Sequence, residues 1–112
     1  MEKYNGQPTF IDLFAGCGGL SLGLEQAGFF PLFVNELNKD ALETYLLNRD
    51  EHYPHLRDTF NSRDIKEVIN NKAFFKKFFS DLQNQFGPQI KKGEVDLVAG
   101  GPPCQGFSGI GI

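Results

Sequence analysis

Two groups of residues in this 112-residue sequence have types and spacing suited to chemistry, and the first is a glycine cluster followed by an acid. Gly16, Gly18 and Gly19 would expose backbone N–H groups and let a ligand approach the main chain closely. Glu36 stands 20 residues after Gly16, which suits an acid that binds the two hydroxyls of a ribose. The pairing indicates a nucleoside cofactor, and the alternative is a tight turn without a ligand.

The residue after the glycines narrows the choice of cofactor. The dinucleotide fingerprint requires a further glycine at position 21, where this sequence has Ser21. NAD and FAD are therefore disfavoured. S-adenosyl-L-methionine needs the same ribose acid but no pyrophosphate cradle, so it fits this pattern better.

The second candidate for chemistry is Cys104. Pro102 and Pro103 restrict the backbone before it and Gly106 follows, a setting that presents a nucleophile on a stiff loop. The alternative is a small buried thiol, the commoner fate of a lone cysteine. Both histidines lie in a polar stretch, which gives a cysteine protease no support, and no Cys-x-x-Cys pair supports a zinc site.

The first half of the sequence predicts the elements that must position the glycines and Glu36. The apolar run 9–14 predicts a buried parallel strand that ends at the glycine cluster. A helix ending at Gly28 follows, with Gly23 allowing close approach to the sheet and one face made of Leu20, Leu24 and Ala27. Residues 29–36 predict a second strand. Asn38 then caps a helix whose core face is Ala41, Leu42, Tyr45 and Leu46.

The second half predicts the elements that lead to Cys104. The polar stretch 50–61 is expected to be a loop, and 62–65 leads into a short helical piece. Residues 71–86 predict a helix with an apolar core stripe made of Phe74, Phe75, Phe78, Phe79, Leu82 and Phe86. A buried strand is expected at 95–99. Strands that alternate with helices indicate a parallel α/β sheet, whose ligands bind outside the carboxyl ends of the strands. The glycine cluster, Glu36, Asp64 and Cys104 all follow such ends, so we expect one crevice.

Composition bounds the class of protein. The length suits one domain, 1–112, and 40% hydrophobic with 22% charged residues fits a globular chain. No apolar run approaches about 18 residues and no secretory signal precedes the first strand, so we expect no membrane contact and a cytoplasmic location. Net charge is −3, but residues 60–93 carry seven bases against three acids. This stretch is interpreted as a solvated helix face, the alternative being a patch facing phosphates.

Four motifs, in order, resemble those of the cytosine-5 DNA methyltransferases. They are Phe10–Gly19, Asn35-Glu36, Arg63–Ile65 and Gly100–Ser108, and together they cover essentially the whole chain. The resemblance implies a Rossmann-like S-adenosylmethionine-dependent methyltransferase fold, of which this chain is expected to form a partial parallel sheet flanked by helices. It also implies duplex DNA as the partner, with nucleoid association when bound.

The resemblance implies a role for each matching residue. Glu36 would bind the ribose hydroxyls, Asp64 the adenine amino group, and Ile65 the adenine ring. The other implied cofactor-binding residues are Phe14, Ala15, Gly16, Gly18, Gly19, Leu20, Leu37, Gly101 and Pro103. Cys104 would be the catalytic nucleophile, and the implied substrate-binding residues are Gln105, Gly106, Phe107 and Ser108.

The family chemistry would run through Cys104. Addition of its thiolate to carbon 6 of a flipped-out cytosine makes carbon 5 nucleophilic enough to take the sulfonium methyl group, and elimination restores the ring. The family's Glu-Asn-Val element, target-recognition region and last motif would all lie beyond Ile112. The resemblance therefore predicts an incomplete catalytic domain, inactive alone, whose missing motifs a second chain could supply.

Other readings of the sequence remain open. One is a non-catalytic module that binds a cofactor or a partner through a bare sheet edge and the basic stretch. Another is an RNA cytosine-5 methyltransferase, although Gln105–Ser108 is closer to the bacterial DNA enzymes. A dehydrogenase is disfavoured by Ser21.

Overall fold

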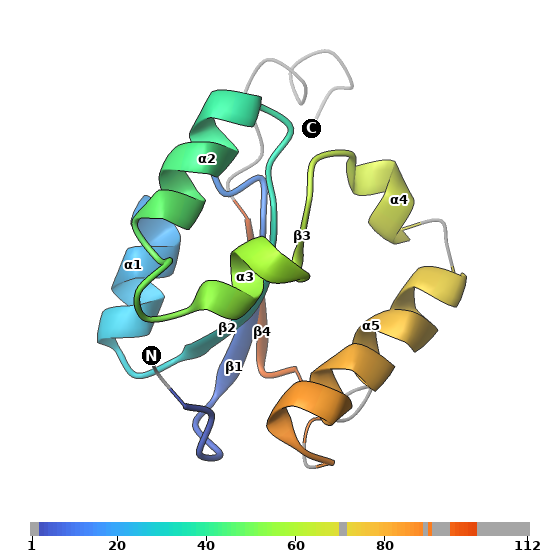
Figure 1. Ribbon diagram of the computed structural model, residues 1–112. Helices are drawn as coiled ribbons and strands as arrows, with labels where there is room; N and C mark the ends of the chain where they lie inside the picture. Colours follow the sequence, from blue (N-terminus) through green and yellow to red (C-terminus); the bar gives the residue numbers. More distant parts are fainter. Residues whose placement is uncertain (1–2, 70–71, 89, 91–94, 101–112) are drawn as a thin grey trace.

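The computed structural model describes residues 3–69, 72–88, 90 and 95–100, and within them a parallel sheet carries helices on both sides (Figure 1). The strands are β1 (Thr9–Leu13), β2 (Phe30–Asn35), β3 (Asn61–Ser62) and β4 (Leu97–Gly100). Their order is β3-β2-β1-β4, and every neighbouring pair is parallel. The expected α/β architecture is confirmed.

In the described part of the chain, five helices connect and flank these strands. They are α1 (Gly19–Gln26), α2 (Lys39–Leu47), α3 (Pro54–Asp58), α4 (Ile65–Ile69) and α5 (Lys72–Phe86). Helices α1 and α2 lie on one side of the sheet and α5 lies on the other (Figure 1). The predicted cap of α2 is confirmed, because the Asn38 side chain accepts a hydrogen bond of 2.9 Å from the Ala41 N–H.

The core forms around β2, whose six residues are all buried. From α2 the buried residues are Leu42, Tyr45 and Leu46, whereas Ala41 is half-buried. From α5, Phe78 and Leu82 are buried, and the other four aromatic residues of the predicted stripe are half-buried against the core. The predicted stripe is thus confirmed as a core face, with its two edges less covered. Residue 71, the predicted start of this helix, lies outside the described residues.

The predicted face of α1 is wrong at two of its three residues. Leu20 is 51% exposed and Ala27 is exposed, Leu24 is half-buried, and the buried residue of the helix is Ser21. The reason is a polar contact, because the Ser21 hydroxyl donates to the Asp12 carboxylate of β1 and turns this side of α1 toward the sheet. Gly23 consequently faces open space, since a Cβ added there would meet no atom within 4 Å.

Two other expectations are corrected. The stretch 50–61 contains α3 and the start of β3 rather than a loop alone, and His55 and Leu56 are buried. The predicted strand 95–99 begins at Leu97 and is not buried, because β4 is the edge strand of the sheet in the described residues. Val98 is 59% exposed there. Smaller differences at the ends of β1 and β2 are within two residues.

Candidate cofactor site at the carboxyl edge of the sheet

The turn between β1 and α1 forms one wall of the site. Phe14, Gly16 and Gly18 have positive φ angles of 57°, 60° and 100°, and glycine adopts such angles at little cost. The Gly18 N–H donates to the Ala15 carbonyl at 3.1 Å, and the Ala15 N–H donates to the Asn35 carbonyl at 3.0 Å. The turn is therefore tied to the end of β2.

Glu36 completes that connection. Its Oε1 accepts from the Gly16 N–H and its Oε2 accepts from the Asn38 N–H, each at 2.8 Å. The glycine turn and Glu36 thus meet directly, as expected for residues that follow the carboxyl ends of neighbouring parallel strands. The next residue, Leu37, is 66% exposed.

The loop after β3 lies next to the loop after β2. The Arg63 Nε donates to the Leu37 carbonyl at 3.1 Å, and the Glu36 N–H donates to the Ser62 carbonyl at 3.0 Å. Asp64 is exposed, and its Oδ1 accepts from the Lys66 N–H at the start of α4. Ile65 is half-buried against the core.

The fourth strand end is described only as far as Gly100. Gly100 pairs with Leu13 in the register of β4 with β1. A Cβ on Gly100 would lie 2.6 Å from the Leu13 carbonyl oxygen, so glycine is required there. The predicted residues Gly101, Pro103, Cys104 and Gln105–Ser108 lie outside the described residues.

A buried polar network behind the turn was not anticipated from the sequence. The Tyr45 hydroxyl donates to Ser21 Oγ at 2.7 Å, and the Ser21 hydroxyl donates to Asp12 Oδ2. Burial raises the pKa of the Asp12 carboxyl, and the nearby negative charge of Glu36 raises it further. An aspartate inside an otherwise apolar strand is the sequence signal that could have located this network.

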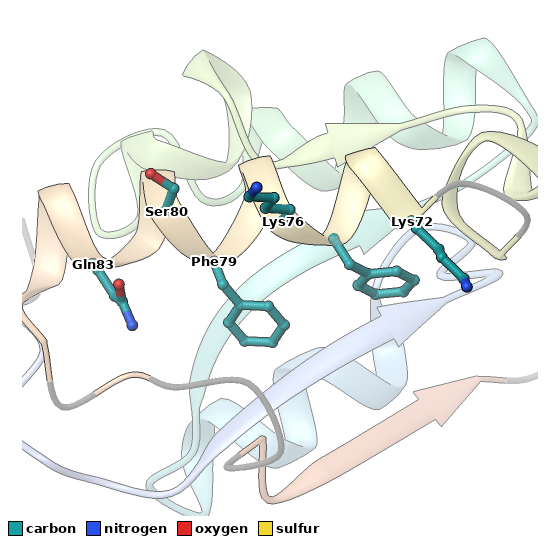
Figure 2. Close-up of a pocket in the computed structure, with 6 residues that line it drawn as sticks. Lys72, Lys76, Phe79, Ser80 and Gln83 are labelled. Atoms are coloured by element: carbon teal, nitrogen blue, oxygen red, sulfur yellow. The ribbon is translucent and has the colours of Figure 1, made fainter.

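Cavity size does not locate the site. An open cavity of about 620 Å³ runs alongside α5, where Phe79 points toward the strands (Figure 2). Its lining residues are Lys72, Phe75, Lys76, Phe79, Ser80 and Gln83, and no residue of the glycine turn is among them. The glycine turn and the acids Glu36 and Asp64 lie instead at the carboxyl edge of the sheet, so the candidate site lies there.

Comparisons with known proteins indicate the family of this chain. The sequence model of the C-5 cytosine-specific DNA methylases matches residues 8–112. Type II methyltransferase M.AgeI of Thalassovita gelatinovora is 43% identical over 101 residues, which are 90% of this chain and 20% of that protein. DNA (cytosine-5)-methyltransferase PliMCI of Paracentrotus lividus is 40% identical over 89% of this chain and 6% of its own length.

A solved structure supports the fold. A crystal structure assigned as a DNA modification methyltransferase of an E. coli prophage has a TM-score of 0.59 and 31% identity, over 89% of this chain and 24% of that chain. This chain thus spans about a fifth of M.AgeI and a quarter of the prophage protein. In the described residues, no helix has the length and apolar character needed to cross a membrane.

Proposed function

This chain belongs to the C-5 cytosine-specific DNA methylase family, and on that premise we propose that it forms the cofactor-binding, nucleophile-bearing part of a DNA (cytosine-5-)-methyltransferase. The proposed cofactor is S-adenosyl-L-methionine and the proposed substrate is cytosine in duplex DNA. The observation that carries the proposal is the hydrogen bond between Gly16 and Glu36, which joins a turn of open backbone to an acid suited to a ribose.

The residues of the turn fit this cofactor. A Cβ added at Gly16 or Gly19 would meet no atom within 4 Å, so the main chain there is open to a ligand. Each Glu36 oxygen accepts one backbone N–H and keeps a further lone pair for a ribose hydroxyl.

The proposed roles of the remaining residues follow the three linked loops. The residues proposed to hold the methionine part are Phe14, Ala15, Gly16, Gly18, Gly19 and Leu20. Leu37, Asp64 and Ile65 are proposed to line the adenine, with Asp64 accepting from its amino group. Gly101 and Pro103 would line the same cofactor. When bound, S-adenosyl-L-methionine supplies an electrophilic methyl group.

Cys104 is proposed as the nucleophile that adds to carbon 6 of cytosine, with Gln105–Ser108 beside the substrate. These residues lie outside the described part of the chain, so their roles rest on the motif Gly100–Ser108. The thiolate is the reactive form of a cysteine, and its addition breaks the aromaticity of the ring so that carbon 5 can attack a methyl group.

A second candidate is a cofactor-binding subunit that acts with a second chain. The edge strand β4 favours it, because Leu97 is 36% and Val98 59% exposed where a further strand could pair. In this case the chain would bind S-adenosyl-L-methionine without transferring its methyl group.

The test is methyl transfer by the protein at its natural length. Labelled S-adenosyl-L-methionine is supplied with duplex DNA, and a duplex containing 5-fluorocytosine is used to trap the covalent adduct. Cys104→Ser is compared with Cys17→Ser, a matched change at the exposed free cysteine of the turn. We expect transfer and adduct with wild type and Cys17→Ser but not with Cys104→Ser. Cofactor binding without transfer would favour the second candidate, and no binding would refute both.

A further inference from the structure

We propose that Tyr45 and Arg49 form a clamp that fixes the Gly18 end of the glycine turn and so sets the affinity for the cofactor. The clamp rests on the proposed function, because its purpose is to hold the turn in a shape that binds S-adenosyl-L-methionine. Both residues would act through the turn, as positioning residues, and would not contact the reacting atoms.

The first argument is the close fit around Gly18. The Arg49 Nη2 donates to the Gly18 carbonyl at 3.1 Å, and the same carbonyl accepts from the Leu22 N–H at 2.9 Å in the first turn of α1. A Cβ on Gly18 would lie 2.7 Å from Tyr45 Cδ2 and 2.8 Å from Arg49 Nη1. The two side chains therefore lie directly against the turn, and only glycine leaves room for them.

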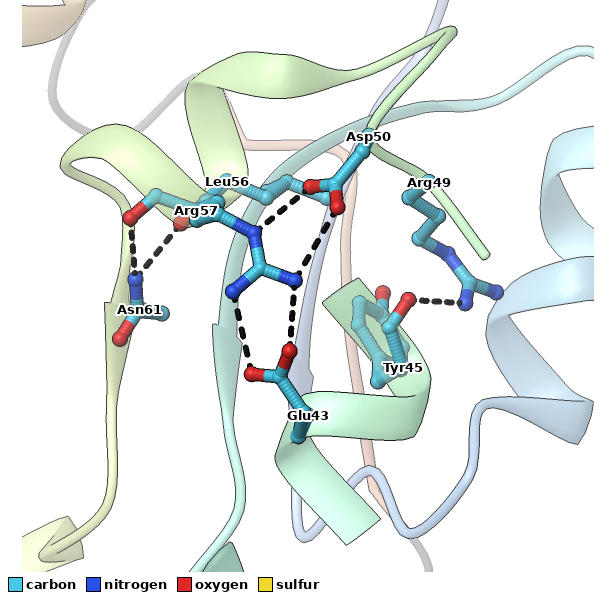
Figure 3. Close-up of polar contacts among 7 residues, drawn as sticks. All are labelled: Glu43, Tyr45, Arg49, Asp50, Leu56, Arg57 and Asn61. Carbon is cyan, nitrogen blue, oxygen red and sulfur yellow. Dashed lines mark hydrogen bonds and ion pairs between the residues drawn. The ribbon is translucent and has the colours of Figure 1, made fainter. Parts of the chain in front are cut away.

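The second argument is that every nitrogen of the Arg49 guanidinium donates a hydrogen bond. Its Nη1 donates to the Tyr45 carbonyl at 3.1 Å (Figure 3). Its Nε donates to Glu25 Oε2 at 2.9 Å. The Arg49 Cζ atom lies 3.7 Å from the centroid of the Tyr45 ring, which is a cation–π contact. Arg49 is 4% exposed, so these contacts are shielded from water.

The third argument is that Tyr45 extends the clamp to the sheet. Its hydroxyl donates to Ser21, which donates to Asp12 of β1, so the clamp joins α2, α1 and β1. Tyr45 has no exposed surface, and burial raises the pKa of its hydroxyl. The hydroxyl therefore keeps its proton at neutral pH and remains a donor.

The position of α2 explains why such a clamp would act on the cofactor. Glu36 precedes α2 and holds the Gly16 N–H, whereas Arg49 follows α2 and holds the Gly18 carbonyl. One helix thus fixes both ends of the turn. Loss of the Arg49 contacts would free the Gly18 end, and binding would then have to order it.

A buried arginine could instead serve packing alone, so the variants must remove charge without leaving an unpaired partner. The clamp variant is Arg49→Met combined with Glu25→Gln. The control is Arg57→Met combined with Glu43→Gln and Asp50→Asn, which likewise leaves no carboxylate unpaired. Arg57 donates to both Glu43 oxygens at 3.0 and 3.1 Å and to both Asp50 oxygens at 2.8 and 3.1 Å, on the side of α2 away from Arg49 (Figure 3).

The experiment uses the protein at its natural length, below the unfolding temperature of each variant. We expect the clamp variant to raise the Kd for S-adenosyl-L-methionine about tenfold or more, the scale of one lost hydrogen bond to a charged group, and the control to change it less than about twofold. In methyl transfer, the KM for the cofactor should rise with kcat unchanged. Backbone amide exchange over residues 15–20 of the ligand-free protein should become faster only in the clamp variant.

The outcomes separate this inference from the proposed function. Wild-type binding with an unchanged Kd in the clamp variant would overturn the clamp and leave the function standing. An equal rise in both variants would also overturn it, since that is a general structural effect. If wild type binds no S-adenosyl-L-methionine, the proposed function fails, and amide exchange alone then decides whether Tyr45 and Arg49 fix the turn.

Discussion

Replacement of Gly18 by alanine is the perturbation whose cost the structure defines most closely. Gly18 has a φ of 100° and a ψ of 24°, a left-handed conformation that costs an L-residue about 1–2 kcal/mol. The new Cβ would lie 2.7 Å from Tyr45 Cδ2 and 2.8–2.9 Å from the Arg49 nitrogens, and overpacking of this kind costs about 1–3 kcal/mol. We therefore expect Gly18→Ala to lower the free energy of unfolding by roughly 3 kcal/mol.

Two neighbouring glycines provide controls for the separate causes. Gly16 has a φ of 60° but open space around a Cβ, so Gly16→Ala should cost only the backbone strain, about 1 kcal/mol. Gly19 begins α1 with open space and no positive φ, so Gly19→Ala should be neutral or stabilise by about 0.4–1 kcal/mol. Urea unfolding of the three variants gives the comparison. Equal losses for Gly18→Ala and Gly19→Ala would refute the reasoning.

Two further predictions concern stability. Burial lowers the pKa of His55 below 6.5, so below that pH the unfolded chain binds a proton that the native chain binds less readily. The free energy of unfolding should therefore fall by up to about 1.4 kcal/mol per pH unit below 6.5. Urea unfolding at a series of pH values should show that this free energy depends less steeply on pH in His55→Phe than in wild type or in His52→Phe, a change at an exposed histidine. Asn38→Ala should lower the free energy of unfolding by about 1 kcal/mol, because it removes the side-chain cap of α2, whereas Asn38→Asp keeps the acceptor and should not lower it. Equal losses for the two variants would contradict a stabilising role for the cap.

The strands and long helices could be predicted because local pattern and tertiary burial agree there. The apolar run 9–14 indicated the buried strand β1, and Asn38 indicated the start of α2. Helix α3 was missed because its charged residues resemble a loop, whereas His55 and Leu56 are buried through contacts with distant parts of the chain. One such contact is the hydrogen bond from His55 Nε2 to the Pro31 carbonyl.

The two ends of the glycine turn differed in predictability. The meeting of Gly16 with Glu36 followed from strand order, since the ends of adjacent parallel strands lie together. The contact of Arg49 with Gly18 could not be predicted, because a charged residue after a helix is ordinarily exposed. Arg49 is buried together with its ion-pair partner Glu25, which lies on α1. The spacing of the two residues in the sequence does not indicate that they pair.

The exposed strand β4 was mispredicted for a related reason. Apolar residues at 95–99 indicate a strand but not how many neighbours cover it. Leu97 and Val98 lie at the edge of the described sheet, so their exposure reflects position in the sheet order.

Calorimetric titration with S-adenosyl-L-methionine tests the central claim, that the turn and Glu36 form a cofactor site. Glu36→Ala removes the acceptor for the ribose, and Glu43→Ala is the matched control, since Glu43 is an exposed acid of α2 that pairs with Arg57. We expect wild type and Glu43→Ala to bind alike and Glu36→Ala to bind roughly 10–100-fold more weakly, the scale of charged hydrogen bonds lost. Equal binding by all three folded proteins, or none by wild type, would contradict the account.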